Sequence, residues 1–353
     1  MFSVLASCFG NERYHENMPN VKYNVVVAVF FLTIVCAPSI SAAADQAADL
    51  LASAKPVPRM QATPLPDSKV ALQRDGVTLA KFHFGKHNRR PFVYPVVGPA
   101  SKRSLTRMGH PHDPLGHSHH NSVWISHNDV AGVSFWADRG KNIGKIVHQR
   151  IERLEDSDNE SAVQSLNHWV DSADKVLLIE RRRIAIQPLE NGQWFMVIDL
   201  QFEAGQSDKP TTINQNPFGM IGVRMAKSIG VNDGGGVIRN SEGGVNEKGP
   251  NGVFRKPAKW VDYSGKITNQ LIEGITLMDH PSNVNHPAPF HVRVDGWMGA
   301  CLTLNKPIAV QPGKSLSLRY GLFVHSGLPK VEAIEKRWQA FSKTKIEKLK
   351  SKR

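Results

Sequence analysis

Between residues 69 and 328, the chain repeats one pattern, in which short apolar runs alternate with clusters of Gly, Pro, Asn and Asp. Runs such as residues 123–125, 133–136 and 194–202 have the length and the β-branched or aromatic content that are typical of strands. We count roughly eighteen such runs, which is too many for one small sandwich. The pattern therefore predicts an all-β fold, a large antiparallel two-sheet sandwich over residues 69–328.

The C-terminal end departs from this pattern. Residues 330–350 follow Pro329 and have apolar side chains at a helical spacing, which predicts a basic C-terminal helix and tail over residues 329–353. Nine basic and three acidic residues between Lys330 and Arg353 supply +6 of the formal net charge of +13. Basic residues do not alternate with aromatic ones anywhere, so we expect no nucleic-acid binding. We expect the tail to lie at the surface and to contact anionic envelope polymers.

The N-terminal region predicts export. Residues 25–36 form an apolar run of signal-peptide length, and small residues follow it, so residues 1–44 read as a signal peptide region with cleavage after Ser41 or Ala44. Met18 fits a start better than Met1 does. Residues 45–68 are rich in Ala and Pro and predict a flexible tether, and no other run is long enough to span a bilayer. We therefore expect a periplasmic or secreted protein whose mature chain keeps one cysteine, Cys301, and no internal disulfide.

A histidine cluster is the strongest functional signal. Six of the fifteen histidines lie within residues 110–127, namely His110, His112, His117, His119, His120 and His127. Imidazole donates or accepts protons, or binds metals, near neutral pH. Residues 121–127 read as a strand, and a period of two places His120 and Trp124 on one face and His119 and His127 on the other. A solvated loop with hydrogen-bonded histidines is the alternative interpretation.

Two later stretches combine polar groups with strand ends. Asp279 and His280 end the apolar run 272–277, where they suit either the rim of a site or a turn capped by its own side chains. In residues 290–293, His291 and Arg293 share one strand face and two apolar residues share the other, which favours a lined concave surface. We therefore predict that His120, Asp279 and His291 are catalytic and converge on one cleft. The predicted substrate-binding residues are His119, His127, Arg224, Trp260, Asp262, His280 and Arg293.

Several ordered motifs resemble one family. They are residues 90–95, 119–124, 218–224, 259–265, 279–283, 290–293 and 320–327. Together they resemble the family catalogued as "methane oxygenase PmoA", a domain of unknown function, over about residues 69–328. Asn121 departs from the basic residue that this family usually has after its His-His pair. A methane monooxygenase subunit of that name spans the membrane, which this chain has no helices to do, so the resemblance implies a fold and a site rather than methane oxidation.

Three functions remain open from the sequence. The first is an exported carbohydrate-active protein with a sandwich resembling the galactose-mutarotase type, in which histidine and aspartate perform general acid–base chemistry on a sugar or glycoside. It needs no cofactor. The second is an enzyme in which His117, His119 or His120 ligates a divalent metal such as Zn, Fe or Cu. The third is a non-catalytic module that binds the envelope or a glycan. Small-molecule or glycan ligands are the expected partners.

Overall fold

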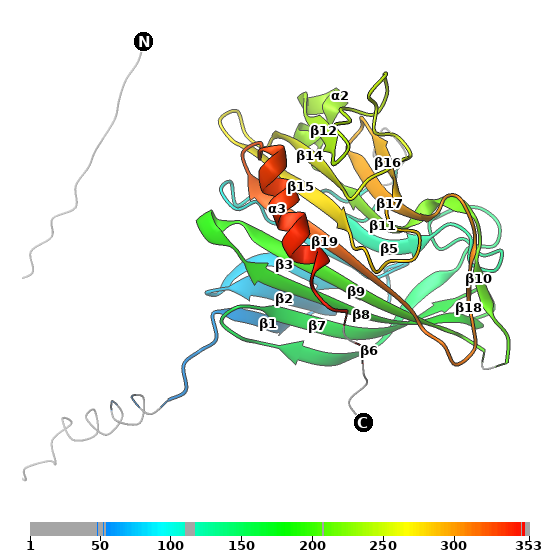
Figure 1. Cartoon of the computed structure of the whole chain (residues 1–353). Coiled ribbons are helices and arrows are strands. Elements are labelled where there is room, and N and C mark those ends of the chain that lie inside the picture. Colours follow the sequence, from blue (N-terminus) through cyan, green and yellow to red (C-terminus); the bar gives the residue numbers. More distant parts are fainter. Residues whose placement is uncertain are drawn as a thin grey trace, which may run out of the picture. The chain divides into compact units, whose positions relative to one another are not determined.

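Two large antiparallel β-sheets pack face to face around an apolar core (Figure 1). The chain is seen in a computed structural model that describes residues 48, 52, 54–109, 117–206, 208–346 and 348–349. Residues 57–353 form one compact unit. The predicted all-β sandwich with a C-terminal helix is confirmed, and nineteen strands lie within the described residues. The finer likeness to the galactose-mutarotase type stays a prediction.

The first sheet has nine strands. In spatial order they are β1 (Met60–Leu65), β2 (Lys69–Arg74), β3 (Val77–His83), β4 (Phe92–Val96), β5 (Val123–His127), β11 (Asn216–Arg224), β17 (Trp297–Thr303), β16 (Pro289–Arg293) and β13 (Lys256–Pro257). Strand β11 pairs with both β5 and β17, although these two lie far apart in the chain. This pairing brings the histidine-rich stretch next to the 290–297 hairpin.

The second sheet has eight strands. In spatial order they are β12 (Val237–Asn240), β14 (Trp260–Lys266), β15 (Ile272–Asp279), β19 (Leu316–Ser326), β9 (Trp194–Ala204), β8 (Val176–Pro188), β7 (Ser161–Val170) and β6 (Lys145–Glu155). The smaller elements are β10 (Thr211–Ile213), which pairs with β18 (Ile308–Val310), the short helix α2 (Val231–Gly234), and the 3₁₀ turns η1 (Glu190–Gly192) and η2 (Lys227–Ile229).

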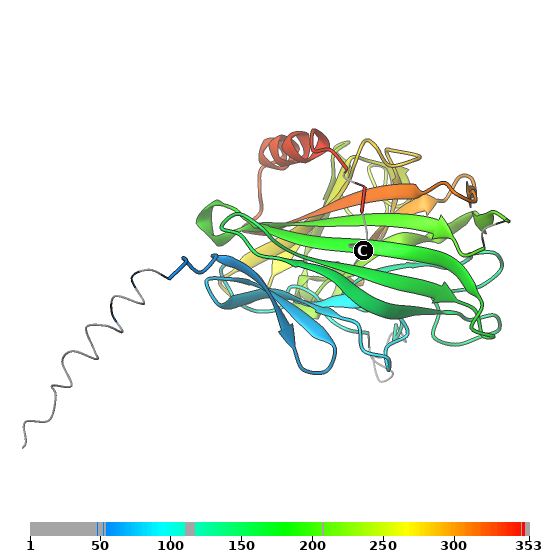
Figure 2. The ribbon, with the colours of Figure 1, turned by 90° about the horizontal axis from the view of Figure 1, so that it is seen from below.

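Alternating side chains on the second sheet build two apolar layers. In β9, Met196 and Ile198 enter the main core between the sheets, whereas Phe195 and Val197 enter a smaller cluster on the outer face. Helix α3 (Val331–Ser342) covers that outer cluster with Ile334 and Phe341. Figure 2 shows α3 and strands β1–β3 on opposite sides of the second sheet. Full burial of one such side chain contributes roughly 1.5–3 kcal/mol, so the helix is held by the sheet.

The structure differs from three of the sequence predictions. The tether predicted over residues 45–68 is wrong from residue 60 onward, because Met60–Leu65 is strand β1, which pairs with β2. Residues 133–136 were predicted as a strand, but the carbonyls of Phe135 and Trp136 accept hydrogen bonds from Arg90 instead of from a neighbouring strand. The predicted tail packs in part, since Leu349 is buried and its N–H donates to Gln201.

The described part of the chain contains no helix that is long and apolar enough to cross a membrane. The predicted signal peptide, residues 1–44, lies outside the described residues.

Candidate active site

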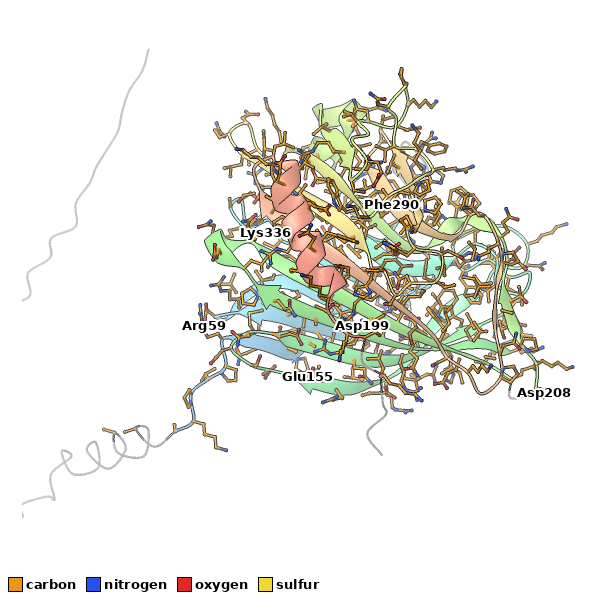
Figure 3. All side chains as sticks on the ribbon, viewed as in Figure 1. Arg59, Glu155, Asp199, Asp208, Phe290 and Lys336 are labelled. Carbon is orange, nitrogen blue, oxygen red and sulfur yellow. The ribbon has the colours of Figure 1, made fainter. Side chains whose placement is uncertain are left out.

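A cleft of about 720 Å³ lies beside the first sheet, where the 117–120 loop meets the β16–β17 hairpin. Its lining combines imidazole, aromatic and charged groups. It is formed by His117, His119, His120, Asn128, Trp136, Phe218, Asn232, Phe254, Arg255, His291, Arg293, Val294, Asp295 and Trp297. Figure 3 labels Phe290 on β16, whose ring is buried in the main core. The next residue, His291, therefore faces the cleft, as the period-two alternation predicted.

The buried guanidinium of Arg90 holds the 119–121 segment in place. It donates to the carbonyl of His119 at 2.9 Å and to Oδ1 of Asn121 at 2.6 Å. On its other side it donates to the carbonyl of Trp136 at 2.8 Å. Burial lowers the pKa of Arg90 to about 10, so the group stays charged at neutral pH. Arg90 thus connects the histidine segment to the carbonyl of Trp136 in the aromatic wall. The side chain of Asn121 accepts from this arginine.

His120 is a closely enclosed imidazole of the cleft. Only 4% of the residue is exposed, and its ring stacks on His117 at 4.7 Å and on Trp124 at 5.0 Å between centroids. The ring of Trp297 lies 5.6 Å away. The Nδ1 of His120 is buried and has no hydrogen-bond partner among the described residues. Aromatic contacts therefore fix the plane of this ring, but no described hydrogen bond at Nδ1 fixes its tautomer.

His291 has a similar environment on the opposite wall. Its ring lies 4.3 Å from that of Trp297, 4.7 Å from that of Phe254 and 5.2 Å from that of Phe218. The residue is 4% exposed, and its buried Nδ1 makes no hydrogen bond of normal geometry to the described residues. A buried polar atom without a partner is unusual and is a frequent mark of a functional group.

Burial keeps three cleft imidazoles, those of His119, His120 and His291, neutral. It lowers the pKa of His119 to about 4. Burial and then the charges of Arg255 and Arg293 lower the pKa of His291 to about 3. For His120, burial comes first and neighbouring positive groups follow, and its pKa lies well below 6.5. These rings therefore enter a reaction at neutral pH as uncharged groups.

Asp295 supplies a carboxylate to the cleft. Its Oδ1 accepts from Arg224 at 3.0 Å, and its Oδ2 lies 3.6 Å from Nδ1 of His117. A second Arg224 nitrogen lies 3.3 Å from the same Nδ1. Because a guanidinium can only donate, Nδ1 of a neutral His117 accepts this bond and Nε2 carries the proton. Arg224, predicted to bind substrate, is itself 0% exposed and orients these two residues from behind.

Asp279 is not brought to the cleft, and this corrects the predicted triad. Its Oδ2 accepts from Nδ1 of His286 at 2.7 Å and from the N–H of Ala288 at 2.9 Å, and its Oδ1 accepts from Asn283. The residue is 1% exposed and does not line the cleft. Its carboxylate organises the turn after β15, which is the capped-turn alternative that the sequence left open.

Three predicted substrate-binding residues of the second sheet also have structural partners. Trp260 is fully buried under α3 and donates to Glu335. His280 contacts Ser282 and the carbonyl of Thr344 through its two ring nitrogens. None of these lines the cleft.

Asp262, the third, is the centre of a buried network. It pairs with His325 at 2.9 Å and with Arg239 at 2.7 Å, and it accepts from Ser264 and Thr276. Burial alone would raise its pKa, but His325 and then Arg239 lower it to about 2. A carboxylate so fully satisfied is stabilised as the anion and stays outside the cleft.

The remaining three substrate-binding predictions have different outcomes, and His119 lines the cleft as predicted. Arg293 lines the cleft and also pairs with Oε1 of Glu247 at 3.1 Å. His127 is fully buried, and Thr303 and the N–H of Asp129 occupy its two ring nitrogens. Burial lowers the pKa of His127 to about 4. It therefore anchors β5 to β17 and does not reach a ligand.

The metal alternative finds no support among the side chains that the structure describes. Among the described residues, no group of three or more His, Cys, Asp or Glu side chains could hold a metal ion. His117 and His120 stack with 3° between their planes, so their nitrogens do not converge on one point as metal ligands do. His110 and His112 lie outside the described residues.

Comparison with known proteins assigns the chain to a family. The model of a family of unknown function, DUF6807, matches residues 69–339. The chain belongs to this family. The expected PmoA assignment is therefore wrong, because the matching model carries no such assignment. The match also continues past residue 328 into helix α3, which the motifs had placed outside.

One solved structure that the chain resembles is that of a protein named "Putative kojibiose phosphorylase from human microbiome". The two share 12% sequence identity with a TM-score of 0.33, over 64% of this chain and 26% of that one. The chain therefore spans about a quarter of that protein's length. A comparison with curated proteins gives no match.

Sequence reasoning missed three residues of the cleft region. Asp295 and Arg255 lie in turns that carried no motif, and Arg90 was noted only within the family-like stretch. A signal for Asp295 was available, since it follows the alternating run 290–293 by two residues. The pairing of Arg224 with it depends on β11 lying beside β17, which only the fold reveals.

Proposed function

We propose that this protein acts on a saccharide in the cleft by general acid–base chemistry. The observation that carries the proposal is the pair of buried imidazoles, His120 and His291, on the walls of one aromatic cleft, each with an Nδ1 that makes no hydrogen bond of normal geometry to the described residues. In contrast, both ring nitrogens of His127 have partners. A buried histidine whose ring nitrogen has no well-formed structural hydrogen bond, on the wall of a cleft, is a candidate for proton transfer.

The lining supports a sugar ligand. Rings of Trp136, Phe218, Phe254 and Trp297 offer apolar faces against which the C–H groups of a pyranose pack. Asn128 and Asn232 offer amide groups for hydroxyls. A volume of about 720 Å³ falls in the range of small-molecule sites, and a few polar groups in an apolar wall are typical of such sites.

The roles follow from charge. Neutral His120 and His291 are the proton acceptors, because their lowered pKa values keep the imidazolium form unpopulated at neutral pH. His117 is the proton donor in its imidazolium form, which the Asp295 carboxylate, 3.6 Å from its Nδ1, stabilises. When this imidazolium gives up its proton, it becomes the neutral ring whose Nδ1 accepts from Arg224. Asp279 has no role in this proposal.

A panel of mono- and disaccharides tests the proposal. Substrates are screened by product analysis, and the turnover of the best one is compared in His120→Gln and His291→Gln. Removal of a general acid or base lowers kcat by about 100-fold or more. His168→Gln on β7, outside the cleft, is the matched control and keeps full turnover. Binding without turnover by the wild-type chain would instead favour the non-catalytic glycan-binding alternative.

We also propose that the protein is exported and that the basic C-terminal residues contact anionic envelope polymers. The apolar run 25–36 with small residues behind it supports export, and the +6 charge of residues 330–353 supports the contact. Mass spectrometry of the native protein tests the first part, since an intact segment 25–40 would contradict it.

A further inference from the structure

Among the described residues, the cleft region carries more positive charge than its carboxylates balance. Asp295 is paired with Arg224, and Glu247 is paired with Arg293. Arg255 also lines the cleft, and no carboxylate among the described residues lies within ion-pair distance of it. Two of the three guanidinium groups are thus paired, and the third is left for a ligand.

The guanidinium groups of Arg255 and Arg293 both lie near the ring of Phe254. The guanidinium carbon of Arg255 is 4.9 Å from the centroid of Phe254, and that of Arg293 is 5.9 Å from it. Both charges also act on His291, whose pKa they lower after burial. Both cations therefore lie close to the ring of Phe254 and act on His291 beside it.

The backbone of this region is held in place. The N–H of Arg255 donates to the carbonyl of Phe290 at 2.7 Å, and the residue has a φ of 56°. Left-handed backbone is unfavourable for an arginine and persists where the surroundings impose it. In the loop between β12 and β13, Glu247 is 2% exposed and accepts from the N–H of Val294 at 2.8 Å, so the partner of Arg293 is also anchored.

We propose that the ligand of the cleft is a saccharide with an anionic substituent, a carboxylate or a phosphate, bound by Arg255 and Arg293. This inference rests on the proposed function and adds the substrate class. Planar guanidinium groups bind carboxylate and phosphate oxygens through paired N–H donors. Phe254, which both guanidinium groups contact and which lines the cleft, would pack against the sugar ring that carries the substituent. Exposure of Arg293 at the cleft leaves it able to share its charge between Glu247 and a ligand.

Calorimetric titration of the full chain tests this inference with glucuronate, glucose 6-phosphate and glucose. At least one anionic sugar is expected to bind about tenfold or more tightly than glucose. Arg255→Gln and Arg293→Gln are expected to abolish most of that difference. Arg153→Gln, a half-exposed arginine on β6 of the other sheet, is the matched control and should keep it.

Equal affinities for all three sugars, or a preference that survives both cleft substitutions, would overturn the inference. The proposed function is tested independently, because its test is the turnover of His120→Gln and His291→Gln and not the difference in affinity between anionic and neutral sugars. A neutral saccharide that is turned over in a histidine-dependent way would thus leave the function standing and remove the anionic substrate class.

Discussion

The imidazoles of His120 and His291 both pack against the indole ring of Trp297, with centroids 5.6 Å and 4.3 Å from it. They come from distant parts of the chain, and β11, which pairs with β5 on one side and β17 on the other, brings them together. A single aromatic side chain thus sets the spacing of the two groups that we assign to proton transfer.

Replacement of this indole tests that spacing. Trp297→Leu is expected to lower saccharide affinity about tenfold or more, and to lower the free energy of unfolding by about 1–3 kcal/mol, because it removes a buried aromatic contact. Trp338→Leu on α3 is the control, since its indole donates to the carbonyl of Asp279 outside the cleft. Denaturant unfolding and titration measure the two effects. Equal loss of affinity in both variants would contradict a specific role for Trp297.

Arg90 is a positioning residue, and we expect its loss to affect both binding and stability. Arg90→Gln removes donors from the carbonyls of His119 and Trp136 and from Asn121, so unfolding should require about 2–4 kcal/mol less. KM should rise more than kcat falls, because the histidine segment is displaced but its chemistry is kept. Arg90→Lys should recover part of the affinity. A stability loss with unchanged KM well below the unfolding temperature would show a purely structural role.

We expect Asp279 to have a structural role and Asp295 to have a catalytic one. Asp279→Asn should lower the free energy of unfolding by about 1–3 kcal/mol, because its partners His286 and Ala288 lose an anionic acceptor, and should leave the kcat of the folded protein unchanged. Asp295→Asn should lower kcat about tenfold or more with a smaller effect on stability. Turnover and denaturant unfolding of both variants test this. The reverse pattern would restore Asp279 as the catalytic base.

The buried neutral histidines predict the direction of acid sensitivity. The pKa of His127 is lowered to about 4, whereas an unfolded histidine titrates near 6.5. Between these values the unfolded chain binds more protons, so stability is fully present above pH 6.5 and falls as the pH decreases toward 4. Each such group contributes roughly 1.4 kcal/mol per pH unit. His127→Asn should flatten this dependence in denaturant unfolding measured from pH 7 to 4, and an unchanged slope would contradict it.

Local periodicity predicted those parts of the fold and site that depend on neighbours in sequence. Alternation in residues 290–293 placed His291 and Arg293 on the face opposite Phe290, and the structure has this arrangement. The same reasoning could not tell a site carboxylate from a structural one. Asp279 and Asp262 looked suitable because they are polar at strand ends or in strands.

Whether a carboxylate is structural or belongs to the site depends on its hydrogen-bond and ion-pair partners, which come from distant parts of the chain. Asp262 bonds His325 on β19, and the Trp260 ring beside it lies under α3. Asp295 gains its place only through Arg224 on β11. The turn at residues 133–136 was predicted as a strand because its apolar residues are strand-like, and the sequence does not show that Arg90 takes up its carbonyls.

The most direct test of the account is to follow the imidazole resonances by NMR while the best-binding saccharide is added, with assignments from single His→Gln variants. We predict that the signals of His120 and His291 shift together, with one saturation curve, while those of His127 and His280 stay in place. Saturable binding that leaves both cleft histidines unperturbed, or that shifts those under α3 instead, would contradict the assignment of this cleft as the saccharide site.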